Sequence, residues 1–271
     1  MKIGIFDSGY GGLTILEKIV EKLPQYDYIY LGDNARTPYG SRSFEVVYQY
    51  TLQCVKKLFE MDCQLIILAC NTASAEALRN IQQADLQRIA PSRKVLGVIR
   101  PTVEKVDEMT ASKTVGLFGT SGTVQSKSYE IEIAKLFPHI TVVSEACPIW
   151  VPLIENNEHT KLGADYFVKQ HIDRLLEKKC EIDAVILGCT HYPLLVKKIE
   201  KYLPQNIKII TQGKLVAESL ENYLFRHPEH ENLCTKNSTV EFFTTESVEK
   251  FVSSASIFLK QKIQAKKVFL G

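Results

Sequence analysis

The sequence predicts an α/β protein made of two similar domains, each built on a parallel β-sheet. Short apolar runs typical of buried strands alternate with amphipathic helical stretches along the chain, which is the pattern of a parallel sheet covered by helices. Two landmarks recur in the same order: Phe6 and Phe118 lie 112 positions apart (118 − 6), and Cys70 and Cys189 lie 119 apart (189 − 70). This repetition predicts two halves related by a pseudo-twofold.

The first hundred residues are predicted to follow a β-α-β-α-β-α-β order. A loop at 7–12, Asp7-Ser8-Gly9-Tyr10-Gly11-Gly12, joins the first strand to the first helix. Its three glycines permit positive φ and a close approach of the backbone to a ligand. The loop lacks both GxGxxG and the Walker lysine, so nucleotide binding is only weakly supported. Strands are predicted at 3–6, 28–32, 65–69 and 94–99, and helices at 13–22, 43–60 and 75–81.

The second half is predicted to repeat this plan, beginning with a strand, a loop of small residues and a helix at 114–123. Two prolines and a tryptophan indicate that 147–155 is a shaped loop, and the polar stretch 227–237 is predicted to be an exposed loop. Further strands are predicted at 140–143, 186–188, 207–210 and 240–244, and helices at 194–200, 214–224 and from 247 through 259 toward the end of the chain.

Composition excludes several classes of partner. The net charge of +2 in 271 residues gives no bias toward nucleic acid or an anionic membrane, and no apolar run approaches the roughly 18 residues that span a bilayer. The chain begins with a strand and not with a signal peptide, so we expect a cytoplasmic protein with reduced thiols. The seven cysteines contain no CxxC pair, and five are expected to pack as small hydrophobic side chains: Cys54, Cys63, Cys147, Cys180 and Cys234.

The other two cysteines, Cys70 and Cys189, each follow a predicted strand and precede a predicted helix. Ligands bind at this edge of an open α/β sheet, where free backbone N–H groups favour anions. Four kinds of chemistry remain open from spacing alone. The first is a single nucleophilic cysteine, which would not need the same pattern twice. The second is a zinc site, but Cys70, Cys189 and His191 do not have compact ligand spacing and a structural site needs a fourth ligand. The third is a redox disulfide, which no CxxC pair supports. The fourth is a pair of acid/base thiols on opposite faces of a substrate carbon, suited to stereoinversion, since both forms of a thiol are accessible near neutral pH.

Four motifs narrow this choice. The chain contains GIFDSGYGGL at 4–13, DNARTPYG at 33–40, ACNTASA at 69–75 and GCTHYPLL at 188–195. Together, and in this order, they resemble the glutamate racemases of the cofactor-independent aspartate/glutamate racemase superfamily. The resemblance spans most of the chain, and no key position departs from it.

The resemblance implies interconversion of L- and D-glutamate without cofactor or metal, supplying D-glutamate for peptidoglycan and the cell wall. It implies that Cys70 acts on the Cα proton of D-glutamate and Cys189 on that of L-glutamate, assisted by Asp7 and His191 respectively. It also implies two α/β domains, at 1–98 plus 208–271 and at 99–207, with the active site between them, and a homodimer. Substrate binding is implied for Asp7, Ser8, Tyr39, Gly40, Asn71, Thr72, Thr190 and His191, and a place near the active site for Glu155.

Some alternatives stay open at this point. Asp7 could simply cap a turn, Glu155 could begin a solvated polar stretch, and Arg36, the one candidate cation of the motif loops, is expected to form a structural salt bridge. A racemase for aspartate or another amino acid, or a binding or regulatory protein on the same scaffold, would share these features.

Overall fold

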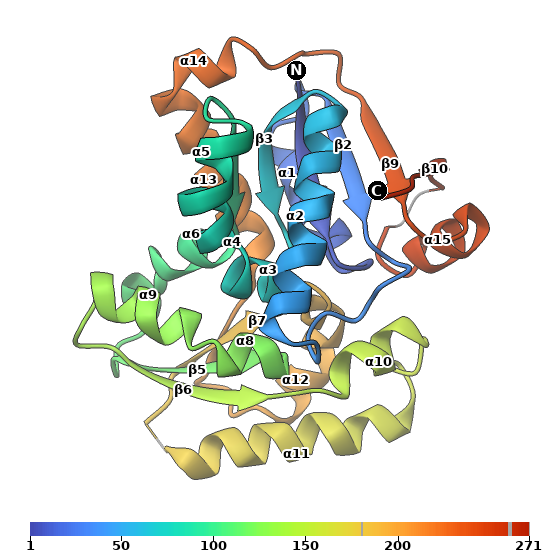
Figure 1. Ribbon diagram of the computed structural model, residues 1–271. Helices are drawn as coiled ribbons and strands as arrows, with labels where there is room; N and C mark the ends of the chain where they lie inside the picture. The colour runs from blue at the N-terminus through green and yellow to red at the C-terminus, as the bar shows by residue number, and fades with distance from the viewer. Residues whose placement is uncertain (180, 260–261, 271) are drawn as a thin grey trace.

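The computed structural model describes residues 1–179, 181–259 and 262–270. It contains two parallel β-sheets, each covered by helices, which lie one above the other in Figure 1. The first sheet has the strand order β10-β9-β2-β1-β3-β4 and the second has the order β6-β5-β7-β8, and every strand pair is parallel. The predicted fold class is therefore confirmed.

The two sheets share a common plan. The order β2-β1-β3-β4 in the first corresponds to β6-β5-β7-β8 in the second, so the strands that precede Cys70 and Cys189 occupy equivalent places. The first sheet consists of β1 (Lys2–Asp7), β2 (Tyr28–Gly32), β3 (Cys63–Leu68), β4 (Lys94–Gly97), β9 (Val240–Thr244) and β10 (Ala265–Lys267). The second consists of β5 (Thr114–Gly119), β6 (Thr141–Ala146), β7 (Ala184–Gly188) and β8 (Lys208–Ile210).

Helices fill the crossovers between parallel strands, as this topology requires. In the first half they are α1 (Leu13–Lys22), α2 (Phe44–Glu60), α3 (Asn71–Glu76), α4 (Leu78–Asn80), the π-helical turn Ile81–Asp85, α5 (Leu86–Ile89), α6 (Ile99–Val103) and α7 (Val106–Met109). In the second half they are α8 (Ser121–Gln125), α9 (Ser128–Leu136), α10 (Trp150–Glu155), α11 (Leu162–Lys178), the 3-10 turn Tyr192–Leu195 and α12 (Val196–Tyr202). The chain then continues through α13 (Gln212–Arg226), α14 (Pro228–Glu231) and α15 (Val248–Ala255).

The hydrophobic core is continuous between the two halves. One buried cluster includes Ile3 and Ile5 of the first sheet together with Val185 and Leu187 of the second and Trp150 of α10. After β8 the chain crosses back, and α13 packs against α1 on the first sheet. Among the described residues, no helix is both long and apolar enough to cross a membrane.

The predicted domain limits need one adjustment. Strand β8 pairs with β7 in the second sheet, although the limit predicted at 207/208 assigns it to the first domain. We propose that the second domain runs from 99 to 210 and that the first comprises 1–98 and 211–271, because the return to the first sheet begins with α13.

Three other local predictions were wrong. The segment predicted as a shaped loop at 147–155 ends in helix α10, and the predicted exposed loop 227–237 contains the short helix α14, with Pro228 at its start. The closing helix ends at Ala255, and Ala265–Lys267 pair with β9 as strand β10. Residues 260 and 261 of its predicted continuation lie outside the described residues.

Candidate active site

The carboxyl ends of the central strands of both sheets meet at one cavity of about 150 Å³. Parallel strands carry their following loops to the same edge of a sheet, which is where an open α/β fold binds ligands. Cys70 comes from the end of β3 and Cys189 from the end of β7, and both thiols line this cavity. The full lining is Ser8, Thr37, Pro38, Tyr39, Gly40, Ser41, Cys70, Asn71, Thr72, Thr120, Ser121, Cys147, Pro148, Val151, Pro152, Cys189, Thr190 and His191.

Cys70 is the N-cap residue of α3. Its Sγ accepts a hydrogen bond from the backbone N–H of Ala73 at 3.4 Å and lies 3.3 Å from Oγ of Ser8, on the glycine loop. Burial, reinforced by the charge of Asp7, raises the pKa of the Cys70 thiol to about 12, although the two hydrogen bonds act in the opposite direction. At neutral pH this cysteine is therefore a protonated thiol, ready to donate.

Cys189 has a different environment, because a histidine lies beside it. Nδ1 of His191 is 3.9 Å from the Cys189 Sγ, and Nε2 of the same ring is 3.0 Å from Oε1 of Glu155. Burial lowers the pKa of His191, but the interactions with Cys189 and Glu155 outweigh it and raise the pKa to about 10. His191 is thus a buried cation at neutral pH, with Nδ1 3.9 Å from the Cys189 sulfur. Glu155 therefore contacts the site through the His191 ring and does not itself line the cavity.

Asp7 ends β1 and is fully buried beneath the glycine loop. Its Oδ2 accepts the backbone N–H of Gly9 at 2.9 Å, and its Oδ1 lies 3.4 Å from Oγ1 of Thr190, in the second half of the chain. Burial raises the pKa of this carboxyl, while the nearby cation of His191 lowers it. Asp7 therefore caps its own loop and also contacts the Cys189 loop through Thr190, but it does not line the cavity. The roles in catalysis and substrate binding that the resemblance implies for it stay predictions.

The glycine loop is needed for close packing and not for positive φ. None of the described glycines has a positive φ. A Cβ on Gly11 would collide with Thr190 and with the ring of His191, and a Cβ on Gly12 would collide with Asp7. Glycine is therefore required where the first half of the chain touches the His191 loop of the second half.

The remaining residues implied for substrate binding also surround the cavity: Ser8, Tyr39, Gly40, Asn71, Thr72 and Thr190. The Asn71 side chain, however, is held by other groups. Its amide donates to Oε1 of Gln212 at 2.6 Å, and its carbonyl oxygen accepts from the Tyr129 hydroxyl at 2.7 Å. Gln212 in turn donates to the Tyr129 hydroxyl at 2.8 Å and to Thr102 at 3.0 Å. What Asn71 can offer a ligand is therefore its backbone at the start of α3.

Tyr39 is positioned by a second buried network. Its hydroxyl donates to Oδ2 of Asp33 at 2.5 Å, and Arg36 pairs with the same carboxylate oxygen at 2.7 Å while stacking on Tyr50. Arg36 does not line the cavity. Arg36 therefore forms the structural salt bridge that was expected, with Asp33.

Sequence reasoning missed Thr120. Its hydroxyl lies 2.9 Å from that of Thr72 and also accepts the backbone N–H of Thr123 as the N-cap of α8. Thr120 is 112 positions after Ser8 (120 − 8), the same offset that relates Phe118 to Phe6. The internal repeat could therefore have identified Thr120, because Thr120 in the second half corresponds to Ser8 in the first.

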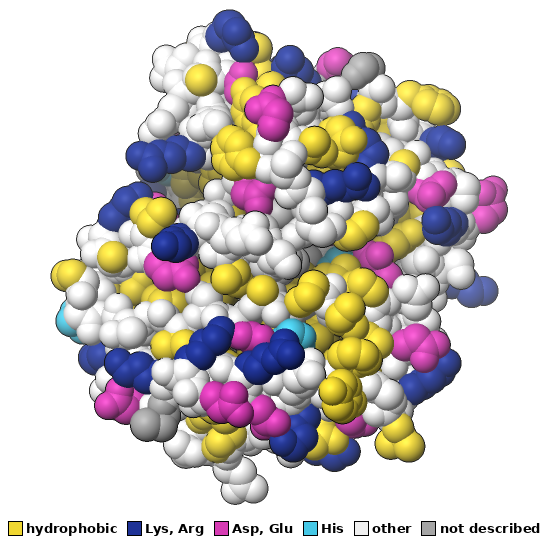
Figure 2. Space-filling model, turned by 60° about the horizontal axis from the view of Figure 1, so that its bottom comes forward, with side chains coloured by type: hydrophobic (Ala, Val, Ile, Leu, Met, Phe, Trp, Pro, Cys, Tyr) yellow, Lys and Arg dark blue, Asp and Glu magenta, His cyan; other side chains and the backbone are white. Residues whose placement is uncertain are grey.

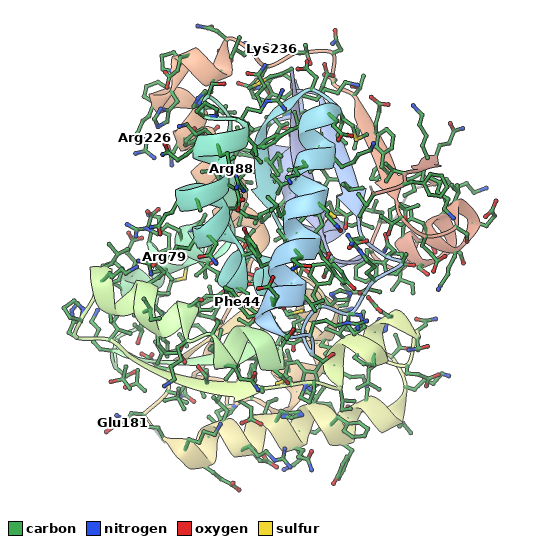
Figure 3. The ribbon with its side chains drawn as sticks, viewed as in Figure 1. Phe44, Arg79, Arg88, Glu181, Arg226 and Lys236 are labelled. Carbon is green, nitrogen blue, oxygen red and sulfur yellow. The ribbon has the colours of Figure 1, made fainter. Side chains whose placement is uncertain are left out.

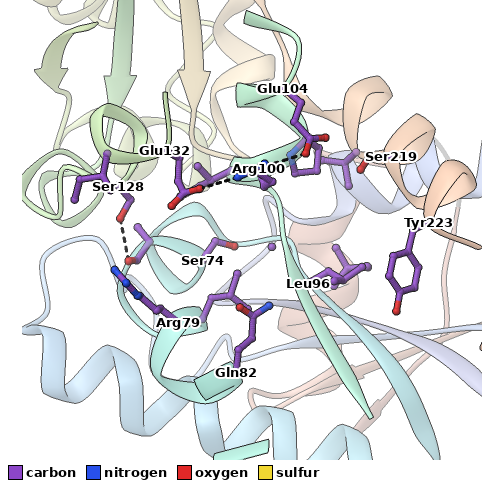
Figure 4. A pocket seen from close by; sticks show the side chains of 18 of the residues that line it. Ser74, Arg79, Gln82, Leu96, Arg100, Glu104, Ser128, Glu132, Ser219 and Tyr223 are labelled. Atoms are coloured by element: carbon purple, nitrogen blue, oxygen red, sulfur yellow. Dashed lines mark hydrogen bonds and ion pairs between the residues drawn. The ribbon is translucent and has the colours of Figure 1, made fainter. Parts of the chain in front are cut away.

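The larger cavity of the molecule lies elsewhere. It measures about 630 Å³, and its border includes Arg79, Gln82, Arg100, Glu104 and Glu132 as well as Ser219 and Tyr223 of α13 (Figure 4). Arg100 forms ion pairs with Glu104 and Glu132. Neither Cys70 nor Cys189 borders this cavity, so volume alone does not identify the reactive site.

Comparison with known proteins agrees with this geometry. The family described as Asp/Glu/Hydantoin racemase matches residues 3–220. A protein named glutamate racemase from Ruegeria sp. (strain TM1040) is 39% identical over 97% of this chain and 98% of its own length.

Solved structures give the same result. A glutamate racemase isoform from Bacillus anthracis superposes with a TM-score of 0.89 at 35% identity, covering 99% of this chain and 97% of that one. A glutamate racemase from Francisella tularensis, solved in complex with D-glutamate, superposes with a TM-score of 0.87 at 36% identity and the same coverage. The strand-end cysteines, the shared sheet plan and these full-length similarities together show that the chain belongs to the Asp/Glu/hydantoin racemase family.

Proposed function

We propose that this enzyme is a racemase that interconverts L- and D-glutamate with two cysteine thiols and no cofactor. The observation that carries the proposal is the placement of Cys70 and Cys189 in one small cavity, each at the end of an equivalent strand of a different sheet. Inversion at Cα requires a proton to leave one face and another to arrive on the opposite face. Two carriers held by two separate loops meet that requirement directly, whereas a single carrier would have to reach both faces.

The proton transfers follow from the two environments. The Cys189 thiolate, next to the His191 cation, removes the Cα proton of L-glutamate, and the Cys70 thiol delivers a proton to the opposite face to give D-glutamate. The reverse reaction exchanges the two roles. Because Cα–H is a very weak acid, the site must stabilise negative charge as it develops next to the α-carboxylate, and preorganised donors in a cavity that excludes water do this most effectively.

The cavity wall suits a dicarboxylate bound by neutral donors. Among the described lining residues there is no lysine or arginine, and the wall is rich in hydroxyl and backbone N–H groups. We assign substrate binding to Ser8, Tyr39-Gly40, Asn71-Thr72 and Thr190-His191, and add Thr120. Supply of D-glutamate for peptidoglycan in the cytoplasm is the cellular role that the family membership supports.

The function is tested by circular-dichroism polarimetry of each glutamate enantiomer without added cofactor. Cys70→Ala and Cys189→Ala should each reduce kcat by at least about 100-fold, since each removes the only proton carrier on one face. Cys234→Ala, a buried thiol outside the cavity, is the matched control and should retain activity. Near-native turnover in either active-site variant would exclude the two-thiol mechanism.

The same assay separates the rival functions. Activity on aspartate or another amino acid in place of glutamate would identify a racemase of different specificity, and inactivity on every enantiomer would identify a binding or regulatory protein.

We also propose that the enzyme is a homodimer. Family membership supports this, and Leu162 and Tyr166, one turn apart on α11, are 86% and 65% exposed. Figure 2 turns the bottom of the Figure 1 view toward the reader. On this face, hydrophobic side chains gather among charged ones. Light scattering after size exclusion tests the assignment, and a monomeric mass at micromolar concentration would refute it.

A further inference from the structure

A second group of chemically capable side chains lies at the junction of α13 and α14, away from the cysteines. His227 caps the end of α13, Pro228 begins α14, and Glu229 and His230 follow in its single turn. One ring nitrogen of each histidine and one carboxylate oxygen of Glu229 all lie within 4.8 Å of one another. Among the described residues, this is the one group of three or more histidine, cysteine or acidic side chains with such a spacing.

The three side chains are already oriented by contacts among themselves. Nδ1 of His227 lies 2.9 Å from Oε1 of Glu229. The ligand atoms of a tetrahedral zinc ion, each about 2.1 Å from the metal, are separated by about 3.4 Å, so small rotations of these side chains would suffice. The rings of His227 and His230 stack with their centroids 5.7 Å apart. His230 also stacks on Tyr223, and the ring of His227 lies against Tyr223 at a tilt, with centroids 4.4 Å apart.

Tyr223 provides the outer partner that metal-ligating histidines normally have. Its hydroxyl lies 2.7 Å from Nδ1 of His230. When Nδ1 carries the proton and donates to this oxygen, Nε2 presents its lone pair outward, and such outer contacts fix both the tautomer and the orientation of the ring. Arg226, the last residue of α13, is exposed and points outward (Figure 3).

We propose that His227, Glu229 and His230 form a binding site for a divalent transition-metal ion of the zinc class, with water completing the coordination. Two imidazoles and one carboxylate select zinc and its neighbours, because magnesium and calcium prefer sites built from oxygen alone. Bound metal would join α14 to the end of α13. The site shares no residue with the thiol cavity, and the proposal does not depend on the racemase mechanism.

The test is a Zn²⁺ titration in competition with a chromophoric chelator, above the ordinary histidine pKa of about 6.5. The native protein should bind one equivalent, and the double variant His227→Ala/His230→Ala should lose it. Tyr223→Phe should bind about tenfold more weakly, because it keeps the ligands and removes the outer contact. His139→Ala is the matched control, since His139 is an exposed histidine paired with one carboxylate, that of Asp107, and this variant should bind as the native protein does.

Two further readouts keep the result specific. Co²⁺ bound at this site should give no sulfur-to-metal charge-transfer absorption. Such absorption would instead reveal Co²⁺ bound at Cys70 or Cys189. Zn²⁺ should raise the Tm of the native protein and of His139→Ala, reversibly with EDTA, and should not raise that of the double variant. Unchanged Zn²⁺ affinity in the double variant, or no saturable binding by the native protein, would overturn the proposal.

Discussion

At the scale of single residues, the two thiols differ because their neighbours differ. Cys70 lies near the Asp7 carboxylate, and burial raises its pKa to about 12, whereas Cys189 has the imidazolium of His191 3.9 Å away. The resting protein therefore has a protonated thiol at Cys70 and a histidine cation beside Cys189. Because the enantiomers have equal free energies in water, kcat/KM must be the same in both directions, and this asymmetry can appear only in kcat and KM separately.

The charge of His191 predicts a pH dependence. Its pKa is raised from 6.5 to about 10, so the cation persists at neutral pH and is lost as the pH rises through that value. We expect kcat/KM to fall in that range. Glu155→Gln removes one of the two partners that raise the pKa, so the alkaline limb should move to lower pH.

The check is the pH profile of kcat/KM for the native protein, Glu155→Gln and the control His139→Asn. The control should follow the native profile, since His139 is an exposed histidine that pairs with Asp107. Superimposable profiles for the native protein and Glu155→Gln would remove His191 from the proton chemistry.

At the scale of elements, one buried polar network ties α3, α9 and α13 together. The Tyr129 hydroxyl donates to Asn71, next to Cys70, and accepts from Gln212 at the start of α13. Tyr129→Phe leaves both partners buried without this bond, which should cost about 1–3 kcal/mol of stability and also lower kcat, because Asn71 is then free to rotate. Tyr28→Phe is the matched control: it also loses one buried hydroxyl contact, to the Leu23 carbonyl, but Tyr28 is at the start of β2, whereas the cavity lies at the carboxyl ends of the strands.

The two variants are compared by denaturant unfolding and by kcat. Both should be destabilised, and only Tyr129→Phe should lose turnover. Equal retention of kcat would show that the network supports the fold and does not position the Cys70 loop.

A buried carboxyl on α3 predicts a pH-dependent stability. Oε2 of Glu76 has no hydrogen-bond partner among the described residues, and a Cβ on Gly122 of α8 would collide with this carboxylate. Burial raises the pKa of Glu76 from 4.5 to about 7. The folded state thus binds the proton more tightly than the unfolded state, so this group lowers stability as the pH rises from 4.5 through 7, by at most about 3 kcal/mol.

Glu76→Gln should therefore stabilise the protein above pH 7 and have little effect near pH 4.5, as measured by urea unfolding across this range. Glu218 is exposed, so the control variant Glu218→Gln should leave the pH dependence of stability unchanged. A Glu76→Gln protein whose stability follows the native pH dependence would show that Glu76 ionises normally in the fold.

The elements also show where sequence patterns reach their limit. The central strands and both strand-end cysteines were predictable because apolar runs and turn residues are local signals. Helix α10 was missed because Pro152 argued against a helix, yet it lies in the first turn, where a missing N–H costs little. Strand β10 was missed because its partner, β9, lies more than twenty positions earlier and no local signal reveals the pairing.

The same limit applies to the site. The motifs identified many of the residues that line the cavity, because each motif is one loop at one strand end, but they did not include Thr120 or the part of the wall formed by Cys147, Pro148, Val151 and Pro152. The contact of His191 with Glu155 spans 36 positions, and that of Asn71 with Gln212 spans 141, so only the fold could reveal them. Charge and burial then decide which side chain acts as an acid, and neither can be obtained from spacing.

At the scale of the whole molecule, each half of the chain contributes one of the two proposed proton carriers, and this proposal predicts an isotopic result. The reaction starts with one unlabelled enantiomer of glutamate in deuterated water and is sampled before appreciable reversal. The thiol that removes the substrate proton holds hydrogen, while the opposite thiol has equilibrated with solvent and holds deuterium. The product should therefore carry deuterium at Cα, and recovered starting enantiomer should carry little.

The starting enantiomer distinguishes the two halves. From L-glutamate the deuterium should come from Cys70, and from D-glutamate it should come from Cys189, so both experiments should label product selectively. One base serving both faces would label substrate and product alike, or pass the original hydrogen across. Equal early labelling of both enantiomers, measured by mass spectrometry after chiral separation, would leave the two-sheet fold intact and rule out opposed thiols, because the cavity between the sheets would then contain only one working proton carrier.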